Sequence, residues 1–346
     1  MLRLIVLIFA LLAPWPALAK PIPIKVVVVT AFEIGADTGD APGEFQHWIE
    51  RYPAAEPLKV PGVERPARLS KDGVLVISTG MFGRARGALT ALIVDPRFDL
   101  SKAYWLMAGI AGVDPKAGSI GSAAWSDWVV DGDPVYEIDD REITPGWPWG
   151  LYGFDAKDPS EKGNGQGASG MAWKLDPGLT RWAFQLTRDI PLPDNPKLAA
   201  ERAGYTAEPA SQKVPHVSVG ASLGTVRFWH GELRTRWARE WVRLQTDGQG
   251  VFAMSDGEDQ AVLDTLSLHA KDGRVDVRRA LVLRTASNYT RPGAGKPMRI
   301  VFADGGSDAG FEAAYRVGAP VVKALVAGWA TYETNLPKAE PQEANR

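Results

Sequence analysis

Long apolar runs alternate with amphipathic stretches along most of this chain. The runs over Ile24–Thr30, Gly73–Thr79 and Ala103–Ala108 are continuous and end at turn residues, which is typical of strands buried on both faces of a parallel sheet. Further strands are predicted near Gly121–Val130 and over Val214–Gly220, Gly250–Met254 and Arg278–Thr285. Helices are predicted over residues 44–51, Arg84–Ile93, Met171–Asp189 (with a break at Pro177-Gly178), Ala199–Ala203, Glu232–Gln245, Asp259–His269 and Asp308–Thr331. This order predicts an α/β fold in which a central mixed, mostly parallel sheet is flanked by helices.

Glycines follow two of the predicted strands. The strand Ala103–Ala108 runs into a Gly-Ile-Ala-Gly turn, and Gly73–Thr79 runs into Gly80 and a predicted helix. A glycine at a strand exit lets a ligand approach the main chain closely, and strand exits of an open α/β sheet are where ligands usually bind. We therefore expect Ala108, Gly109 and Gly112 to line a binding site, although such turns also occur for packing reasons alone.

The first residues differ from the rest. Arg3, an apolar run broken by Pro14 and Pro16, and Ala17-Leu18-Ala19 before Lys20 predict a cleaved signal peptide over residues 1–19, rather than a membrane anchor. A periplasmic or secreted protein is therefore expected. Residues 20–334 show no internal repeat or linker and predict one α/β domain, and the polar residues 335–346 predict a disordered tail.

Composition narrows the chemistry further. The chain has no cysteine, which excludes thiol catalysis and cysteine-zinc sites, and its four histidines show no metal-ligand spacing. A formal net charge of −2 does not favour nucleic acid as a partner. Residues 131–170 lack periodicity, and such long irregular segments are often functional. Thirteen tryptophans suit stacking on sugars or bases, but core packing explains most of them more simply.

Four segments carry a resemblance to a known family. FDLSKAYWLMAGIAGVDPKAGSIGSAAW, VYEIDDREI, VRLQTDGQGVFAMSDGEDQAVL and LRTASNYTRP resemble the purine nucleoside permease family, in order and over nearly the whole mature chain. That family is itself similar to the nucleoside phosphorylases. The resemblance implies a phosphorylase-like α/β fold and binding of purine or pyrimidine nucleosides. Because no segment after the leader is long and apolar enough to span a membrane, we expect any role in uptake to be indirect.

The resemblance also implies particular site residues. Phosphorylases hold the sugar hydroxyls with a Met-Glu pair just before a helix, and the matching residues here are Met254 and Glu258. A strand end that carries Ser-Asp in phosphorylases reads Ser287-Asn288 here, and asparagine binds a base without acting as an acid. Trp229 occupies the region that supplies a stacking aromatic. Each position also has a plain structural explanation: Glu258 as a helix N-terminal acid, Asn288 as a turn residue and Trp229 as a core aromatic.

The sequence also offers groups for a phosphate site. The amides around Gly80 precede a predicted helix, and Arg84 could supply positive charge, although a solvated helix arginine is the simpler interpretation. Glu33 follows the first strand and could hold a water molecule or a sugar hydroxyl. No metal and no cofactor is expected, while phosphate as a co-substrate stays open.

Two functions from different classes remain open. The first is an exported protein that binds nucleosides for uptake, transport or salvage. The alternative is a nucleoside phosphorylase or hydrolase that cleaves the N-glycosidic bond. Asn288 favours binding, whereas Glu258 beside an arginine-lined anion site would favour catalysis. The tryptophans alone motivate a weaker third hypothesis, a sugar or aromatic-ligand binder. Homo-oligomers are compatible with the sequence.

Overall fold

A computed structural model describes residues 20–53, 55–163, 170–297 and 305–340. The predicted signal peptide and residues 341–346 of the predicted tail lie outside the described residues. Within those four ranges, no helix is long and apolar enough to cross a membrane. The same residues hold no cluster of histidines and carboxylates able to bind a metal ion.

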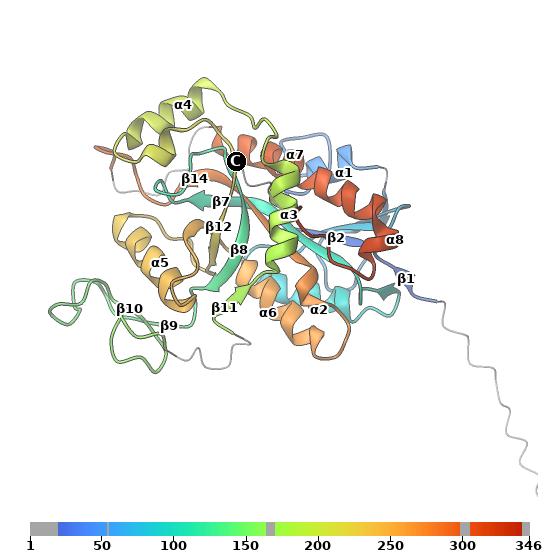
Figure 1. Cartoon of the computed structure of the whole chain (residues 1–346), viewed down its shortest axis with the longest axis horizontal. Coiled ribbons are helices and arrows are strands. Elements are labelled where there is room, and N and C mark those ends of the chain that lie inside the picture. Colours follow the sequence, from blue (N-terminus) through green and yellow to red (C-terminus); the bar gives the residue numbers. More distant parts are fainter. Residues whose placement is uncertain (1–19, 54, 164–169, 298–304, 341–346) are drawn as a thin grey trace, which may run out of the picture.

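Most strands form one mixed sheet (Figure 1). Its order is β11-β8-β12-β13-β7-β2-β5-β4-β3, and β14 pairs with both β7 and β8. These strands are β2 (Val26–Thr30), β3 (Ala55–Leu58), β4 (Ala67–Ser70), β5 (Val74–Ser78), β7 (Tyr104–Val113), β8 (Ala123–Asp131), β11 (Ala172–Lys174), β12 (Val217–Gly224), β13 (Phe252–Asp256) and β14 (Ala280–Tyr289). Two small sheets pair β1 (Ile22–Pro23) with β6 (Phe98–Asp99), and β9 (Val135–Glu137) with β10 (Leu151–Gly153).

Five of these strands close into a ring. β8 pairs with β12, β12 with β13, β13 with β7, β7 with β14, and β14 again with β8. Two bulges make this closure compatible with the pairing, one in β12 next to Ser222 and one in β14 between Ala286 and Asn288. A bulge bends its strand and re-aims the side chains beside it. The ends of β7, β13 and β14 are thereby brought to one place.

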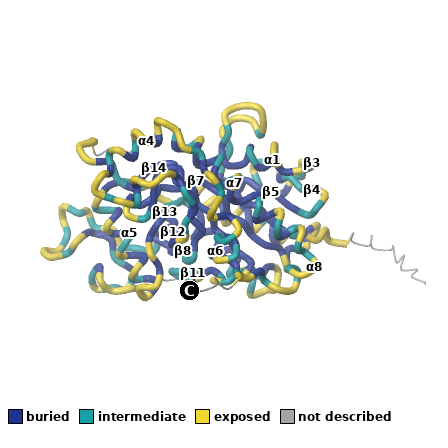
Figure 2. The backbone as a smooth tube through the Cα atoms, turned by 45° about the horizontal axis from the view of Figure 1, so that its top comes forward, coloured by how far each residue is buried: buried dark blue, intermediate teal, exposed yellow. Residues whose placement is uncertain are grey.

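Helices cover both faces of the sheet. They are α1 (Gln46–Arg51), α2 (Arg84–Ile93), α3 (Pro177–Thr187), α4 (Pro196–Arg202), α5 (Glu232–Gln245), α6 (Asp259–Ala270), α7 (Gly306–Ala327) and α8 (Trp329–Tyr332), with short 3₁₀ turns at Ala203–Tyr205, Pro209–Gln212 and Val277–Arg279. Val27 and Val29 of β2 pack in the same cluster as residues of α2 and α6, whereas Val26 and Val28 pack with residues of α1, α3 and α7. The strand is therefore apolar at every position because both of its faces are covered, and Figure 2 shows the sheet as the buried centre of the molecule.

Most predicted elements occur close to their expected positions, and Arg84–Ile93 and Glu232–Gln245 are helices with those bounds. The predicted turn at Gly109–Gly112 is wrong, because β7 continues as a strand to Val113. The helix predicted from Met171 is wrong in its first part, because Ala172–Lys174 form strand β11. Pro177 and Gly178 do not break a helix but begin α3, where the Asp176 side chain accepts hydrogen bonds from the Gly178 and Leu179 amides. Proline is favoured at this first helical position since its missing N–H would have had no partner there.

The irregular segment that follows β8 forms an arm. β9 and β10 pair as an antiparallel hairpin, which projects from the body of the molecule in Figure 1. Tyr136 contacts the rings of Tyr152 and Phe154, and Trp147 contacts Tyr152. These aromatic residues hold the arm together and are not part of the central core.

Trp125 offers a test of this packing. Its side chain is fully buried, and its indole N–H donates to Thr187 Oγ1 at 2.9 Å, which ties β8 to α3. Trp125→Ala should lower the free energy of unfolding by about 3–5 kcal/mol, as expected for deletion of a large core side chain. Trp147→Ala, in the arm, should change it by less than about 1 kcal/mol. Equal losses in urea denaturation would contradict the placement of both residues.

Candidate functional site

A pocket opens where the ends of β2, β7, β13 and β14 meet. Its empty volume is about 720 Å³, including open solvent at its mouth. The lining combines aromatic rings, backbone and a few acids: Ala31, Phe32, Glu44, Met81, Phe82, Ile110, Ala111, Gly112, Thr225, Arg227, Phe228, Trp229, Ser255, Asp256, Gly257, Glu258, Ser287 and Asn288. A mostly apolar hollow with a few convergent polar groups is the usual form of a small-molecule site.

A buried arginine stands behind this pocket. Arg284, on β14, is 2% exposed and forms a two-pronged ion pair with Asp259, with N–O distances of 3.0 and 2.5 Å. The same Nη2 atom lies 2.8 Å from Glu258 Oε1 and 3.6 Å from Asp256 Oδ1. Arg284 does not itself line the pocket, whereas Glu258 and Asp256 do. The guanidinium therefore connects the pocket wall to the start of α6.

Glu44 completes this cluster from the loop before α1. One carboxylate oxygen accepts a hydrogen bond from the Ala31 amide at 2.6 Å, and the other accepts one from the Ile110 amide at 2.7 Å. The side chain thus ties the exit of β2 to β7. It is also buried, with 4% of the residue exposed, and lines the pocket.

Two glycines make room for these side chains. A Cβ on Gly109 would overlap Glu44 Oε1 and lie 2.6 Å from Arg284 Nη1. A Cβ on Gly112 would lie 2.9 Å from Ser255 Oγ and 3.1 Å from Asn288 Nδ2. Close approach does explain both glycines, but the sequence predicts a ligand there, whereas at both positions the approaching groups are side chains of the protein itself.

The charges in the cluster are unbalanced. Burial raises the pKa of Glu44, Glu258 and Asp259 to about 7, and the Arg284 charge opposes this rise. The pKa of Arg284 is raised well above its usual value by the surrounding carboxylates. Ser222 Oγ contacts Asp256 and lies 2.9 Å from Asp259 Oδ2. A hydroxyl has a single hydrogen, so it can donate to only one of the two carboxylates.

Asn288 lies in the pocket wall opposite Gly112. Its Nδ2 donates to the Tyr289 carbonyl at 3.0 Å, and its Oδ1 accepts from Ser287 Oγ at 3.0 Å. An amide has two hydrogens and two acceptor positions, so each end keeps one further position for a ligand. The bulge in β14 sets this orientation, because it shifts the register between Ala286 and Asn288.

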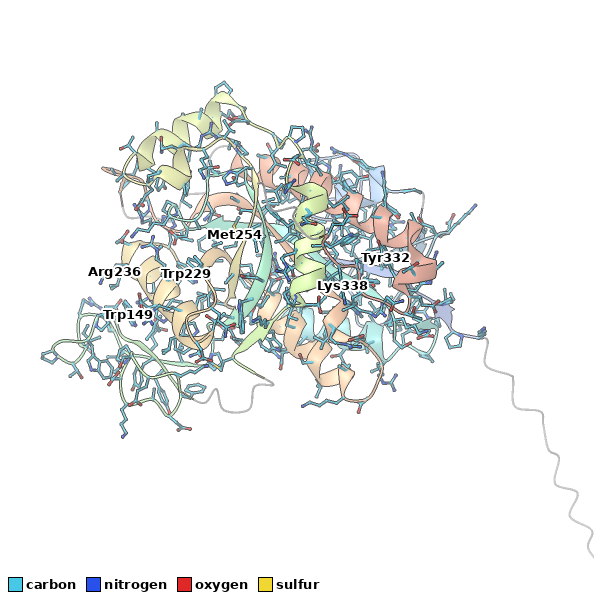
Figure 3. The ribbon with its side chains drawn as sticks, viewed as in Figure 1. Trp149, Trp229, Arg236, Met254, Tyr332 and Lys338 are labelled. Atoms are coloured by element: carbon cyan, nitrogen blue, oxygen red, sulfur yellow. The ribbon has the colours of Figure 1, made fainter. Side chains whose placement is uncertain are left out.

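Four of the residues predicted to bind a nucleoside line this pocket, namely Glu258, Asn288, Gly112 and Trp229. Trp229 also packs edge to face on Trp237, with ring centroids 6.2 Å apart. Met254 lies in the same half of the molecule as Trp229 (Figure 3). Its side chain, however, is in a core cluster with Val113 and Tyr289 rather than in the pocket. Ala108 likewise packs in the core beside α7. Met254 alternates along β13 with Ser255, which does line the pocket, so the Met254 side chain points inward. Gly109, also predicted to bind, does not line the pocket, because Glu44 and Arg284 fill the space beside it.

The remaining predicted residues lie around a second hollow next to the first. Glu33, Gly80 and Arg84 line it, together with Phe32, Met81 and Phe82, which face both hollows. Glu33 accepts hydrogen bonds from the backbone amides of Gly43, Phe45 and Gln46, so its carboxylate organises its own loop. Arg84 is largely exposed and pairs with Glu64 at 3.4 Å.

Sequence reasoning missed Glu44, Arg284 and the ring of Phe82. Phe82 has a positive φ of 58°, and its ring packs against Gly257 so closely that a Cβ there would lie 2.7 Å away. Non-glycine residues adopt this backbone region rarely, and it often marks functional sites. One available signal was the charge of Arg284 inside an otherwise apolar run, Ala280–Thr285.

Comparison with known proteins gives a family match. A model of the family described as purine nucleoside permease matches residues 23–337. A purine nucleoside permease of Candida albicans is 27% identical over 252 residues, which cover 71% of this chain and 62% of that protein. A protein named as a probable purine nucleoside permease of Schizosaccharomyces pombe is 27% identical over 257 residues, covering 71% of this chain and 73% of that protein. The match thus spans less than two thirds of the Candida protein.

Solved structures match the fold. The 5'-methylthioadenosine/S-adenosylhomocysteine nucleosidase of Helicobacter pylori has a TM-score of 0.51 at 13% identity, covering 87% of this chain and 98% of that chain. Futalosine hydrolase of the same organism has a TM-score of 0.51 at 14% identity, covering 88% and 97%. At such identities the likeness shows the fold alone, and it confirms the predicted α/β fold of nucleoside phosphorylase type.

The space at Gly109 can be tested directly. Gly109→Ala should destabilise the fold by about 1–3 kcal/mol, because the new methyl group must displace Glu44 or Arg284. Gly87→Ala, in α2, has no heavy atom within 4 Å of the added Cβ and should be neutral or slightly stabilising. Urea denaturation of both variants would measure the difference, and a tolerated Gly109→Ala would contradict the close contact.

The raised pKa values predict an unusual dependence of stability on pH. A carboxyl with a pKa near 7 in the folded chain and near 4.5 when unfolded keeps its proton up to a higher pH in the folded state. The free energy of unfolding should therefore fall as pH rises from about 4.5 to 7, by up to about 1.4 kcal/mol per pH unit for one proton. Glu258→Gln should flatten this decline, whereas Asp272→Asn, an exposed acid after α6, should leave it unchanged. If the free energy of unfolding falls equally steeply with pH in Glu258→Gln and wild type, the raised pKa of Glu258 is refuted.

Proposed function

We propose that this chain, which belongs to the purine nucleoside permease family, binds purine or pyrimidine nucleosides in the pocket between β2, β7, β13 and β14. The observation that carries the proposal is the meeting of Glu258, Asn288 and Gly112 around one hollow. These residues come from the start of α6, from the bulge of β14 and from β7. Their convergence is what a nucleoside requires, since its sugar, its base and the bond between them must be held together.

Each part of a nucleoside finds a suitable group. A carboxylate accepts hydrogen bonds from two hydroxyls, so Glu258 suits the ribose. Asn288 keeps one donor and one acceptor position for the edge of a base. The rings of Phe82, Phe228 and Trp229 offer apolar surface, and stacking of a base on an aromatic ring contributes about 1–3 kcal/mol.

The biological role that fits is uptake or salvage of nucleosides by an exported protein. The relatives from Candida albicans and Schizosaccharomyces pombe are named permeases. None of the helices in the described ranges could cross a membrane. In this proposal the exported protein captures the nucleoside outside the inner membrane, and a separate membrane component carries the nucleoside across.

A specific observation supports cleavage as a second candidate. Glu44 and Glu258 both line the pocket, and burial raises the pKa of each to about 7. One can then be a carboxylic acid and the other a carboxylate near neutral pH, as general acid–base chemistry requires. In hydrolysis, the carboxylate would take a proton from water, the water oxygen would bond to C1′, and the C1′–N bond would break. The departing base would carry away the bonding electrons and receive the proton of the carboxylic acid.

One experiment separates the two functions. The purified protein is incubated with inosine, adenosine or uridine, with and without phosphate, while binding is followed by calorimetry and free base by chromatography. Binding without free base supports the proposed function. Free base in both conditions identifies a hydrolase, and free base with phosphate alone identifies a phosphorylase. If the protein neither binds nor cleaves any of these nucleosides, the proposal is refuted.

Glu258 is the residue whose removal should matter most. Glu258→Ala should weaken nucleoside affinity by about 1–3 kcal/mol, or about 5- to 150-fold, since the ribose hydroxyls lose their acceptor. Asp272→Asn removes a carboxylate from an exposed loop outside the pocket and should bind like wild type. Calorimetric titration with inosine gives both values, and an affinity that Glu258→Ala leaves intact would place the sugar elsewhere.

A further inference from the structure

The buried cluster behind the pocket contains more negative than positive charge. Arg284 is faced by Glu44 from the loop before α1, by Asp256 at the end of β13, and by Glu258 and Asp259 at the start of α6. Arg284 also donates to the Ile110 carbonyl of β7 at 3.4 Å, and Ser222 of β12 contacts Asp259. Four carboxylates thus surround one guanidinium, although burying even one unpaired charge is costly.

The contacts of Arg284 divide into two kinds. Its two-pronged pair with Asp259 lies away from the pocket and joins β14 to the start of α6. Its contact with Glu258, at 2.8 Å, acts on a side chain that lines the pocket. Among the described residues, Arg284 is the only cation within 4 Å of Glu258. A purely structural arginine would need the first kind of contact alone.

We propose that Arg284 is a positioning residue for ligand binding: without lining the pocket, it holds Glu258 in place and favours its ionised form, and so sets the pH range in which a nucleoside binds. The inference rests on the proposed function, because it assumes that Glu258 accepts hydrogen bonds from the sugar. A protonated carboxyl group accepts such bonds poorly, since its hydroxyl is itself a donor. Affinity should therefore fall as pH drops below the value at which Glu258 gains a proton.

The same charge balance points to the class of ligand. The single positive charge of Arg284 is already matched by carboxylates, and Arg227 at the pocket rim pairs with Glu137 of the arm. Among the residues that the structure describes, no lysine lines the pocket. An anionic ligand would meet Glu44, Asp256 and Glu258 without a compensating cation, and like charges disfavour association strongly. The pocket should therefore accept uncharged nucleosides and reject nucleoside monophosphates by about 100-fold or more.

The test compares pH profiles of affinity. Inosine binding is measured by calorimetry from about pH 5 to 9, and the midpoint at which affinity is lost is compared among variants. Arg284→Gln should raise that midpoint by at least about one pH unit, because Glu258 loses its cation. Arg284→Lys, which keeps the charge but not the fork, should move it less. Asp256→Asn should move it in the opposite direction, because a neighbouring negative charge is removed.

Arg279 provides the matched control. It is a buried arginine just before β14, but its guanidinium donates to the carbonyls of Tyr332 and Glu333 on the far side of the fold. Arg279→Lys should therefore leave the midpoint unchanged. If Arg284→Gln does not fold, Arg284→Lys and Asp256→Asn still decide the question, since they predict shifts of opposite sign.

Failure of this inference differs from failure of the proposed function. If wild-type protein binds inosine and the midpoint is the same in Arg284→Lys, Arg284→Gln and Asp256→Asn, only the role of Arg284 is overturned. Wild-type protein that binds no nucleoside at any pH would overturn both. A carboxyl carbon NMR titration of Glu258 without ligand gives an independent midpoint, and it should shift in the same directions. Inosine monophosphate that binds as tightly as inosine would overturn the charge argument.

Discussion

The rest of the site depends on the ion pair between Arg284 and Asp259. It fixes the start of α6 against the middle of β14 inside the protein, where neither charge can be left without the other. Glu258 precedes Asp259, so the same pair determines where the pocket acid lies. Replacement by apolar residues would often be tolerated for stability alone. The additional acids around Arg284 are therefore better understood as a requirement of the pocket than of the fold.

The backbone is shaped to make this cluster possible. Gly109 leaves space that Glu44 and Arg284 fill, and the bulge in β12 re-aims Ser222 toward the acids of β13 and α6. The bulge in β14 turns Asn288 toward Gly112 in the same way. Each irregularity weakens a strand locally. All of them occur where the ring of five strands carries side chains of the pocket.

The sequence predicted the order of elements well because strands buried on both faces and amphipathic helices leave clear periodic patterns. It predicted Glu258 and Asn288 as a pair through the family resemblance, since periodicity carries no information on contacts across the sheet. It placed a turn at Gly109–Gly112 because glycine usually ends a strand, whereas here the strand continues and its glycines leave room for neighbouring side chains. Glu44 was missed because the sequence places it at the start of a helix over residues 44–51, whereas α1 begins at Gln46, and because its partners Ala31 and Ile110 are distant in sequence.

Charge pairing also bears on the choice between binding and cleavage. Phosphorolysis needs a cation that can turn toward phosphate, but the arginines around both hollows already have partners: Arg284 pairs with Asp259, Arg227 with Glu137, Arg84 with Glu64 and Arg65 with Asp37. A phosphate ion would compete with a carboxylate for each arginine, weakly so at the exposed pair of Arg84 and Glu64, and beside the buried acids it would meet repulsion as well. Water meets no such obstacle. If the chain is an enzyme, hydrolysis therefore agrees better with its electrostatics than phosphorolysis, and Asn288, which cannot donate a proton as an acid, leaves that task to a pocket carboxyl group such as Glu44 or Glu258.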